Sequence, residues 1–358
     1  MKKSYLMIAA AVALLTACED TDVLNKAAEI AEAAQEQAIS FESFTENVTK
    51  ATISGVDALK TEGGFVVYGY KTIDNWASTP QTVFNGVNVK WNTTSSAWYY
   101  DNLRFWDKNG KYNFYAVAPY SPTDGASYSI VAPIATGYGM ITIDGAESKI
   151  STESDDYLID RDGVIGELGI NHTNSSNPKV EFDFHHIMAK LTFALKSTLS
   201  SGTVTVTDLK MSGWNSGAGK FVQTLTSTPT TLVRDEWTIA TAGAGNVTLV
   251  GTGASQTSVA LTCSESATAT PVTDWYIMVP QEIAANGLVF KVTYTYSDES
   301  GYSETFADQT ATLSAAQVWG TDSYTNYTLD IKPAAIEFDV KSICGFDVNG
   351  GTQNAQID

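Results

Sequence analysis

Histidine and cysteine are scarce in this chain, with three residues of each type among 358. The sequence also lacks a Gly-x-Ser-x-Gly elbow, a His-Glu-x-x-His motif, a phosphate-binding loop and a dinucleotide fingerprint. Residues 213–220 are rich in glycine, but they lack a final Ser or Thr and a following helix, so they predict a turn. These absences predict a protein that is not an enzyme.

Basic residues are also few. Lys and Arg together number 21, against 40 Asp and Glu, and the net charge is −19. Proteins bind nucleic acid largely through Lys and Arg contacts to phosphate, so nucleic acid is not an expected partner. A net charge this far from zero keeps a protein soluble.

The apolar run at residues 5–15 is too short to cross a bilayer as a helix, which needs ~20 residues. It follows two lysines and has the length of a signal-peptide core. The next residues, Leu15-Thr16-Ala17-Cys18, resemble a lipobox, in which a protease cuts before the cysteine and a lipid is attached to its thiol. We therefore predict a signal peptide at residues 1–17 and a lipidated tether at residues 18–38, attached through Cys18.

Thr, Ser, Gly, Val and Tyr dominate the rest of the chain, in short alternating runs between turn residues. This pattern predicts an all-β fold of the sandwich type. At ~100–200 residues per domain, the length suggests two domains. We predict an N-terminal β-sandwich at residues 39–198 and a C-terminal one at residues 199–358, joined by a Ser/Gly-rich linker.

Residues 180–196 are predicted to form one long strand. Apolar side chains occupy every second position from Val180, but the phase shifts by one residue from Leu191 onward. Such a shift moves the apolar side chains to the other face of a sheet, and a bulge or bend near Ala189 and Lys190 would absorb it. The strand therefore serves two packing surfaces.

His186 lies in phase with the apolar residues of this strand, and no second ligand for a metal is evident. The adjacent His185 points to the opposite face of the strand, so the two histidines do not readily share one metal ion. We predict that His186 is structural and that the chain has no metal site.

Residues 184–191, with the pattern Phe-x-His-x-Met-Ala-Lys-Leu, resemble a motif of the fimbrillin family, the lipoprotein pilins of Bacteroides-type bacteria. Further segments resemble this family in the same order, at residues 65–70, 275–280 and 327–331. The resemblance implies two transthyretin-like β-sandwiches without a cofactor. It also implies an outer-membrane lipoprotein, carrying palmitate, that serves at the cell surface as a structural subunit of fimbriae and supports adhesion.

In that family, subunits polymerise when proteolysis removes an N-terminal strand and a strand of another subunit fills the groove, a form of β-augmentation. Thr49-Lys50-Ala51 resembles the family's cleavage site, although Lys50 lacks the planar guanidinium of the usual Arg. An ordinary surface lysine is the alternative, and Lys60 is the next basic candidate. Cleavage would release the lipid, the tether and the first strand, at residues 39–44.

The donor strand is predicted at residues 336–348, where Ile336, Phe338 and Val340 alternate with polar residues ahead of a Gly-rich tail. The alternative is that this segment simply pairs as an edge strand of its own domain. The sequence does not distinguish a stalk, an anchor or a tip subunit.

Three other features admit two interpretations each. The aromatic residues at 91–120 could stack on sugars in a surface glycan-binding lipoprotein, but such rings more often fill a sandwich core. Residues 155–163 are acidic enough for a calcium loop, but their spacing fits no known one, and a solvated turn that leads into a strand at Asp156-Tyr157-Leu158 is favoured. Cys263 and Cys344 either pair as a disulfide or remain thiols.

Overall fold

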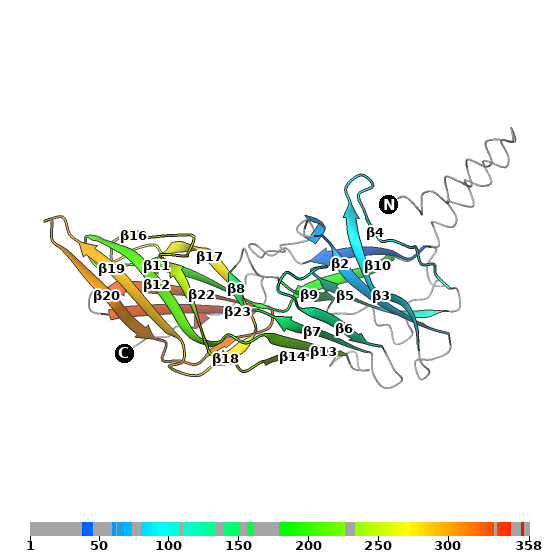
Figure 1. Ribbon diagram of the computed structural model, residues 1–358. Helices are drawn as coiled ribbons and strands as arrows, with labels where there is room; N and C mark the ends of the chain where they lie inside the picture. The colour runs from blue at the N-terminus through cyan, green and yellow to red at the C-terminus, as the bar shows by residue number, and fades with distance from the viewer. Residues whose placement is uncertain are drawn as a thin grey trace.

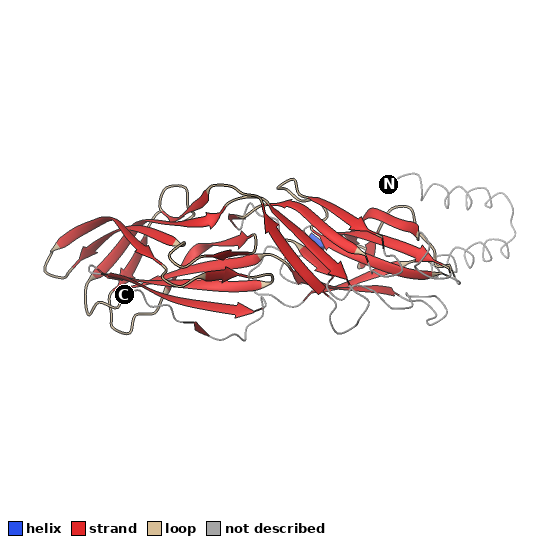
Figure 2. Cartoon of the chain, turned by 90° about the horizontal axis from the view of Figure 1, so that it is seen from below, coloured by secondary structure: helices blue, strands red, loops and turns tan. Residues whose placement is uncertain are grey.

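The computed structural model describes residues 38–45, 59–61, 63–73, 80–107, 110–132, 139–150, 156–160, 179–225, 233–332, 335–344 and 352–353. Strands make up most of this part of the chain (Figure 2), which confirms the all-β prediction. Within it, helix is limited to one turn at residues 59–61. No helix among these residues is long and apolar enough to cross a membrane.

Sheet I has seven strands in the order β1-β10-β9-β5-β2-β3-β4, and β1 lies at its edge. Its strands are β1 (Ser40–Thr45), β2 (Phe65–Thr72), β3 (Gln81–Asn92), β4 (Ala97–Tyr99), β5 (Lys111–Ala118), β9 (Leu158–Asp160) and β10 (Lys179–His186). The approach of β2 to β3 depends on Gly64, which has a φ of +96°. A Cβ at this position would lie 1.9 Å from the carbonyl oxygen of Val89, so only glycine fits there.

Sheet II has four strands in the order β14-β13-β7-β6. They are β6 (Ser127–Val131), β7 (Met140–Ala146), β13 (Gly219–Leu225) and β14 (Val233–Ile239). Sheet II packs on one face of sheet I through a shared cluster that includes Tyr115, Ile143 and Phe221. Because β13 comes from the second half of the chain and pairs with β7 from the first, hydrogen bonding crosses the expected boundary at residues 198 and 199. The division into two domains therefore remains a prediction.

Sheet III has six strands in the order β24-β23-β22-β11-β17-β8. They are β8 (Lys149–Ile150), β11 (Ala189–Lys196), β17 (Thr270–Met278), β22 (Ser323–Lys332), β23 (Ala335–Cys344) and β24 (Thr352–Gln353). β22 shows the expected alternation, with Tyr327, Leu329 and Ile331 fully buried.

Sheet IV has the order β15-β12-β19-β20, and β16 also pairs with β12. Its strands are β12 (Thr203–Asn215), β15 (Ala244–Val250), β16 (Val259–Thr262), β19 (Val289–Ser297) and β20 (Ser303–Thr312). A short pair, β18 (Gln281–Ile283) and β21 (Gln317–Trp319), lies beside them. Sheets III and IV enclose one apolar core, to which Leu191 and Leu329 contribute from one side and Val206 and Phe290 from the other.

β10 and β11 together correspond to the long strand predicted from the sequence. Phe182 and Phe184 of β10 pack in the core on sheet I, whereas Leu191 of β11 packs between sheets III and IV. The phase shift therefore does mark two packing surfaces. The strand breaks at Ile187 and Met188, earlier than the expected position, because both backbone polar groups of Ile187 bond outside the ladders.

The molecule is elongated (Figure 1). β2, β3 and β10 lie towards one end, and β11, β19 and β20 lie towards the other. Sheets I and II therefore form one half of the molecule and sheets III and IV the other, with β10 and β11 running from the first half into the second.

Candidate functional site

The first strand has the apolar alternation expected from its sequence. Ile39 and Phe41 are 1% and 4% exposed, whereas Ser40 and Glu42 are half-buried. β1 pairs in parallel with β10, from Ser40 opposite Lys179 to Thr45 opposite Phe184. The predicted first strand is thus confirmed, and it occupies the edge of a sheet.

A second segment holds β1 on the side away from β10. Ala38 forms an antiparallel bridge with Phe105, and the Ile39 amide donates a hydrogen bond to the Arg104 carbonyl at 2.8 Å. The Tyr100 hydroxyl donates to the Ile39 carbonyl at 2.7 Å. Burial raises the pKa of the Tyr100 hydroxyl above its usual value of 10.0, so the hydroxyl remains a neutral donor.

β1 therefore closes sheet I into a curled layer. It pairs with β10 at one side and lies against β4, the strand at the opposite edge of the same sheet, at the other. The curled sheet surrounds an apolar core of its own, separate from the cluster shared with sheet II. Removing β1 would open this core along the length of one strand.

Phe41 lies at the centre of an aromatic cluster. Its ring centroid lies 5.3 Å from that of Phe84, 5.5 Å from Tyr100, 6.0 Å from Phe114 and 5.6 Å from Phe182. Edge-to-face and stacked rings at these distances contribute beyond the apolar area that they bury. The site is therefore an aromatic pocket that accepts a large side chain from an edge strand.

Lys179 marks the outer side of the same site. Its ammonium group forms an ion pair with Glu42 of β1, and both side chains are substantially exposed. Such pairs contribute about 0–1 kcal/mol to stability, so this one adds little to the hold on β1. Sequence reasoning missed Lys179 and Tyr100, because nothing local links either residue to the first strand.

The predicted donor residues lie in β23. This strand pairs antiparallel with β22, and the register places Ile336 opposite Ile331 and Phe338 opposite Leu329. Val340 is buried in the core between sheets III and IV. Within one chain, β23 thus belongs to a different sheet from β1. The alternative interpretation is therefore borne out in part. β23 pairs within its own half of the molecule, but β24, and not β23, lies at the edge of sheet III.

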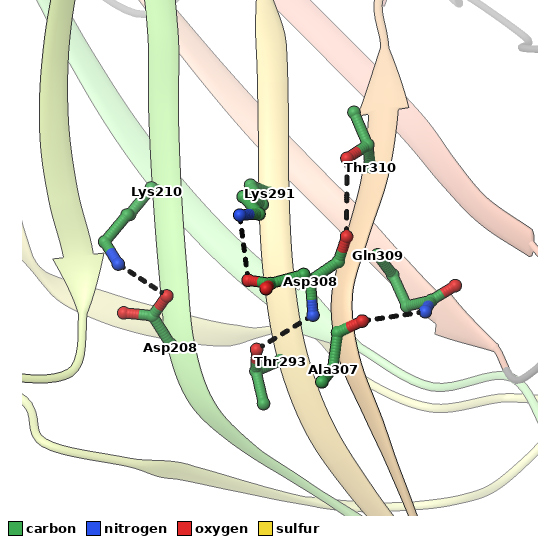
Figure 3. A network of polar contacts seen from close by, with 8 residues as sticks. All are labelled: Asp208, Lys210, Lys291, Thr293, Ala307, Asp308, Gln309 and Thr310. Carbon is green, nitrogen blue, oxygen red and sulfur yellow. Dashed lines mark hydrogen bonds and ion pairs between the residues drawn. The ribbon is translucent and has the colours of Figure 1, made fainter.

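β20 lies at the edge of sheet IV and differs from β1. The register shifts opposite Thr293, and Asp308 has a φ of +54°. The Asp308 carboxylate forms an ion pair with the Lys291 ammonium group at 2.9 Å, and the Asp308 amide donates a hydrogen bond to Thr293 Oγ1 at 3.1 Å (Figure 3). Bulges and charges are the usual protection of a sheet edge against pairing with another chain. This edge is therefore poorly suited to accept a strand.

Several predicted site residues lie elsewhere. Cys18 and Lys50 fall outside the described residues. Lys60, the second basic candidate, lies in the helical turn with its ammonium group 4.3 Å from the centroid of the Trp91 ring. Cys263 is a buried free thiol that donates to Ser197 Oγ at 3.5 Å, so it forms no disulfide in this structure.

His186 is buried, and its Nδ1 lies 3.0 Å from the carboxylate of Asp156. Asp156 is the partner that sequence reasoning missed, although it starts the strand predicted at Asp156-Tyr157-Leu158. In the described part of the chain, no group of three His, Cys, Asp or Glu side chains is arranged to hold a metal ion.

The acidic segment at residues 155–163 differs from the expected solvated turn. Its described part leads into β9 as predicted, but Asp156 and Asp160 are only 1% and 2% exposed. They are buried because β9 lies inside sheet I, between β10 and β5. The aromatic segment mostly fills the core, as Tyr100, Trp106 and Phe114 do, whereas Tyr99 is exposed.

Comparison with known proteins identifies the family. The sequence model of the family described as fimbrillin-like matches residues 49–344. Fimbrium subunit Fim1C of Phocaeicola vulgatus is 31% identical over 189 residues, and the alignment covers 48% of this chain and 48% of that relative. The chain thus spans about half the length of this curated relative.

Among solved structures, a fimbrial protein from Bacteroides vulgatus ATCC 8482 has the same fold. It superposes with a TM-score of 0.62 at 19% sequence identity, and the match covers 88% of this chain and 99% of that one. Because the family match also extends over most of the chain, the chain belongs to the fimbrillin-like family.

Proposed function

We propose that this chain is a structural subunit of cell-surface fimbriae and that it polymerises by exchange of the first strand. Membership of the fimbrillin-like family supports the fimbrial role, and so do the names of the two relatives, a fimbrium subunit and a fimbrial protein. The proposal includes no enzymatic activity. The chain binds other subunits, and the resulting fibre supports adhesion.

The observation that carries the proposal is the position of β1. It is an edge strand close to the N-terminus, and it closes an apolar core. Cleavage after Lys50 would separate it from the rest of the chain. Losing the buried Ile39 and Phe41 side chains exposes surface worth about 1.5–3 kcal/mol for each residue. An opened subunit is therefore driven to accept another apolar strand.

The C-terminal strand has a sequence similar to the one that would be lost. Residues 38–42 read Ala-Ile-Ser-Phe-Glu, and residues 335–339 read Ala-Ile-Glu-Phe-Asp. The apolar positions are identical, and an acid follows the phenylalanine in both. In the same register, Ile336 and Phe338 of a neighbour would occupy the places of Ile39 and Phe41.

The acid in this shared pattern has a partner at the site. Glu42 pairs with Lys179 in the single chain. A donor strand in the matching register brings Asp339 to the same lysine. Lys179 would then favour the register in which Phe338, and not a polar neighbour, enters the aromatic pocket. For the donor strand, the exchange replaces one pairing, with β22, by another, with β10.

The proposal also includes attachment of a lipid to the chain before assembly. A subunit attached through Cys18 would reach the outer membrane as a lipoprotein and be displayed at the cell surface. Cleavage after Lys50 would release the lipid, the tether and β1 together, so that detachment and activation for assembly are one event.

Two variants test the exchange in cells that express the chain as their only subunit. Lys50→Ala should retain the lipid and the first strand, and Phe338→Asp should place a charge in the aromatic pocket. Both should abolish the SDS-resistant ladders of the wild type. Glu337→Ser is the matched control for Phe338→Asp. It changes the adjacent residue to the one that β1 carries at the corresponding position, Ser40, and it should retain the ladders.

The outcomes separate the steps. Normal ladders from both variants would refute the mechanism. Loss only in Phe338→Asp would keep the strand exchange and move the cleavage to another basic residue, with Lys60 next in order. Equal loss in Phe338→Asp and Glu337→Ser would mean that the strand was damaged in general, and would remove the support for the register.

A further inference from the structure

Two parallel pairings run along the molecule. β1 pairs with β10 over six Cα pairs, and β11 pairs with β22 over eight. All other pairings among the described strands are antiparallel; the pairings of β2 with β3 and of β12 with β19 are two examples. Because β10 and β11 are consecutive in the chain, the two parallel pairings share one covalent strand that crosses from one half of the molecule to the other (Figure 1).

The register fixes where this path starts and ends. Ser40 lies opposite Lys179, at the start of β10. Asp330 lies opposite Lys196, so Lys332 at the end of β22 lies beside the end of β11. A pull on the N-terminal end of β1 and a pull on Lys332 therefore act at opposite ends of the β10–β11 strand.

These two points are also where a fibre would be joined. If subunits exchange strands as in the proposed function, on which this inference rests, the incoming strand enters at the place of β1. The outgoing strand, β23, begins at Ala335, directly after β22. We propose that the β10–β11 strand bears tension in the fibre and carries it from the incoming strand to the outgoing one, with the β1–β10 and β11–β22 pairings loaded in shear.

Loading in shear gives weak bonds collective strength. A backbone hydrogen bond contributes only about 0.5–1.5 kcal/mol net, so strands that are peeled apart from one end yield one bond at a time at low force. When the strands slide along each other, all bonds of the pairing must break together. Resistance to a pull depends on the barrier to unfolding and not on the equilibrium stability, so this geometry is suited to a fibre under tension.

The junction between β10 and β11 is held on several sides. The Ile187 amide donates to the Tyr157 carbonyl at 3.1 Å, and the Trp237 indole donates to the Ile187 carbonyl at 3.1 Å. Ile187 and Met188 are almost fully buried in the cluster that sheets I and II share, to which Ile277 of β17 also contributes from the other half. The strand therefore enters sheet III without a loose segment that would extend under load.

Single-molecule pulling on the uncut, unlipidated monomer tests the path. One handle is attached to the chain N-terminal to Ala38. The second is attached by click chemistry to an azide-bearing residue at Lys332, which loads β1 in shear. In the matched control it is attached at Lys179, at the same end of the β1–β10 pair, so that the same backbone bonds are peeled one after another. All attachments are made in the Glu42→Gln variant, so that the ion pair of Glu42 with Lys179 contributes to none of the measured forces. We expect the first rupture force to be severalfold higher for Lys332 than for Lys179.

A third attachment, at Lys196 at the end of β11, leaves the β11–β22 pairing out of the loaded path. The first rupture force measured at Lys196 should equal that measured at Lys332, because the β1–β10 pairing, with six pairs, should break before the β11–β22 pairing, with eight. A rupture force at Lys332 that is no higher than the force at Lys179 would overturn the proposal. A rupture force at Lys332 that is clearly lower than the force at Lys196 would also overturn it. The uncut monomer keeps its own β1, so these results do not depend on strand exchange. Normal ladders from Phe338→Asp would refute the strand exchange and leave the force path in the monomer unaffected. Equal rupture forces at Lys332 and Lys179 would refute the force path and leave the strand exchange unaffected.

Discussion

Replacing Phe41 with Ala tests how strongly β1 is held before assembly. The ring is 4% exposed and contacts four other aromatic rings with centroids 5.3–6.0 Å away. Truncating a buried Phe to Ala costs about 3–5 kcal/mol, because apolar burial is lost and a cavity remains. Whole domains are stable by about 5–15 kcal/mol, so this loss is a large part of the total.

The measurement is urea unfolding of the uncut, unlipidated chain, followed by circular dichroism and tryptophan fluorescence. Glu42→Ala is the matched control on the same strand, because it removes only an exposed ion pair with Lys179 and should cost no more than about 1 kcal/mol. A loss of less than about 1 kcal/mol for Phe41→Ala, or a loss equal to that of the control, would refute the view that Phe41 anchors β1.

The same variant distinguishes the monomer from the fibre. If cleavage removes β1, Phe41 is absent from assembled subunits, and Phe41→Ala should leave the SDS resistance of the ladders unchanged. The loosened strand should also speed the appearance of ladders. Ladders that dissociate more readily than those of the wild type would show that β1 remains in the fibre.

Three further changes test other parts of the structure. His186→Ala should destabilise the uncut chain by about 3 kcal/mol or more in urea unfolding, because the buried Asp156 carboxylate loses its imidazole partner, whereas folded His186→Phe should still form ladders and lose no bound metal. Tyr100→Phe should cost about 1 kcal/mol through loss of the bond to Ile39. Since the folded pKa of Tyr100 is raised, that contribution is complete below pH ~10 and is lost as the pH rises through the folded pKa. An alkaline urea series that is identical for wild type and Tyr100→Phe would contradict this assignment. Cys18→Ser should abolish incorporation of labelled palmitate, and unchanged labelling would exclude lipidation at this residue.

The sequence determined the local structure of the candidate site. Alternation identified β1 through Ile39 and Phe41, and β10 through Phe182 and Phe184, because burial of one face of a strand requires apolar residues at every second position. The phase shift before Leu191 also indicated two packing surfaces, because a shift by one residue turns the apolar side chains to the other face.

The tertiary structure alone decided which segments meet. A period-two pattern states which face of a strand is apolar, but it does not state which sheet or side chain covers that face. The Tyr100 hydroxyl over Ile39, and the pairing of Lys179 with Glu42, join residues far apart in the sequence. No local preference encodes such contacts, so they were not predicted.

Buried polar groups show the same limit. Asp156 and Asp160 belong to an acidic segment, which by itself favours exposure to solvent. They are buried because β9 is inserted between β10 and β5, and a buried carboxylate is tolerated only where a partner such as His186 is supplied by another strand. The sequence by itself thus determined the strands and their apolar faces. Which strands lie side by side, and so which edge strand covers an apolar core, was decided by packing between distant segments.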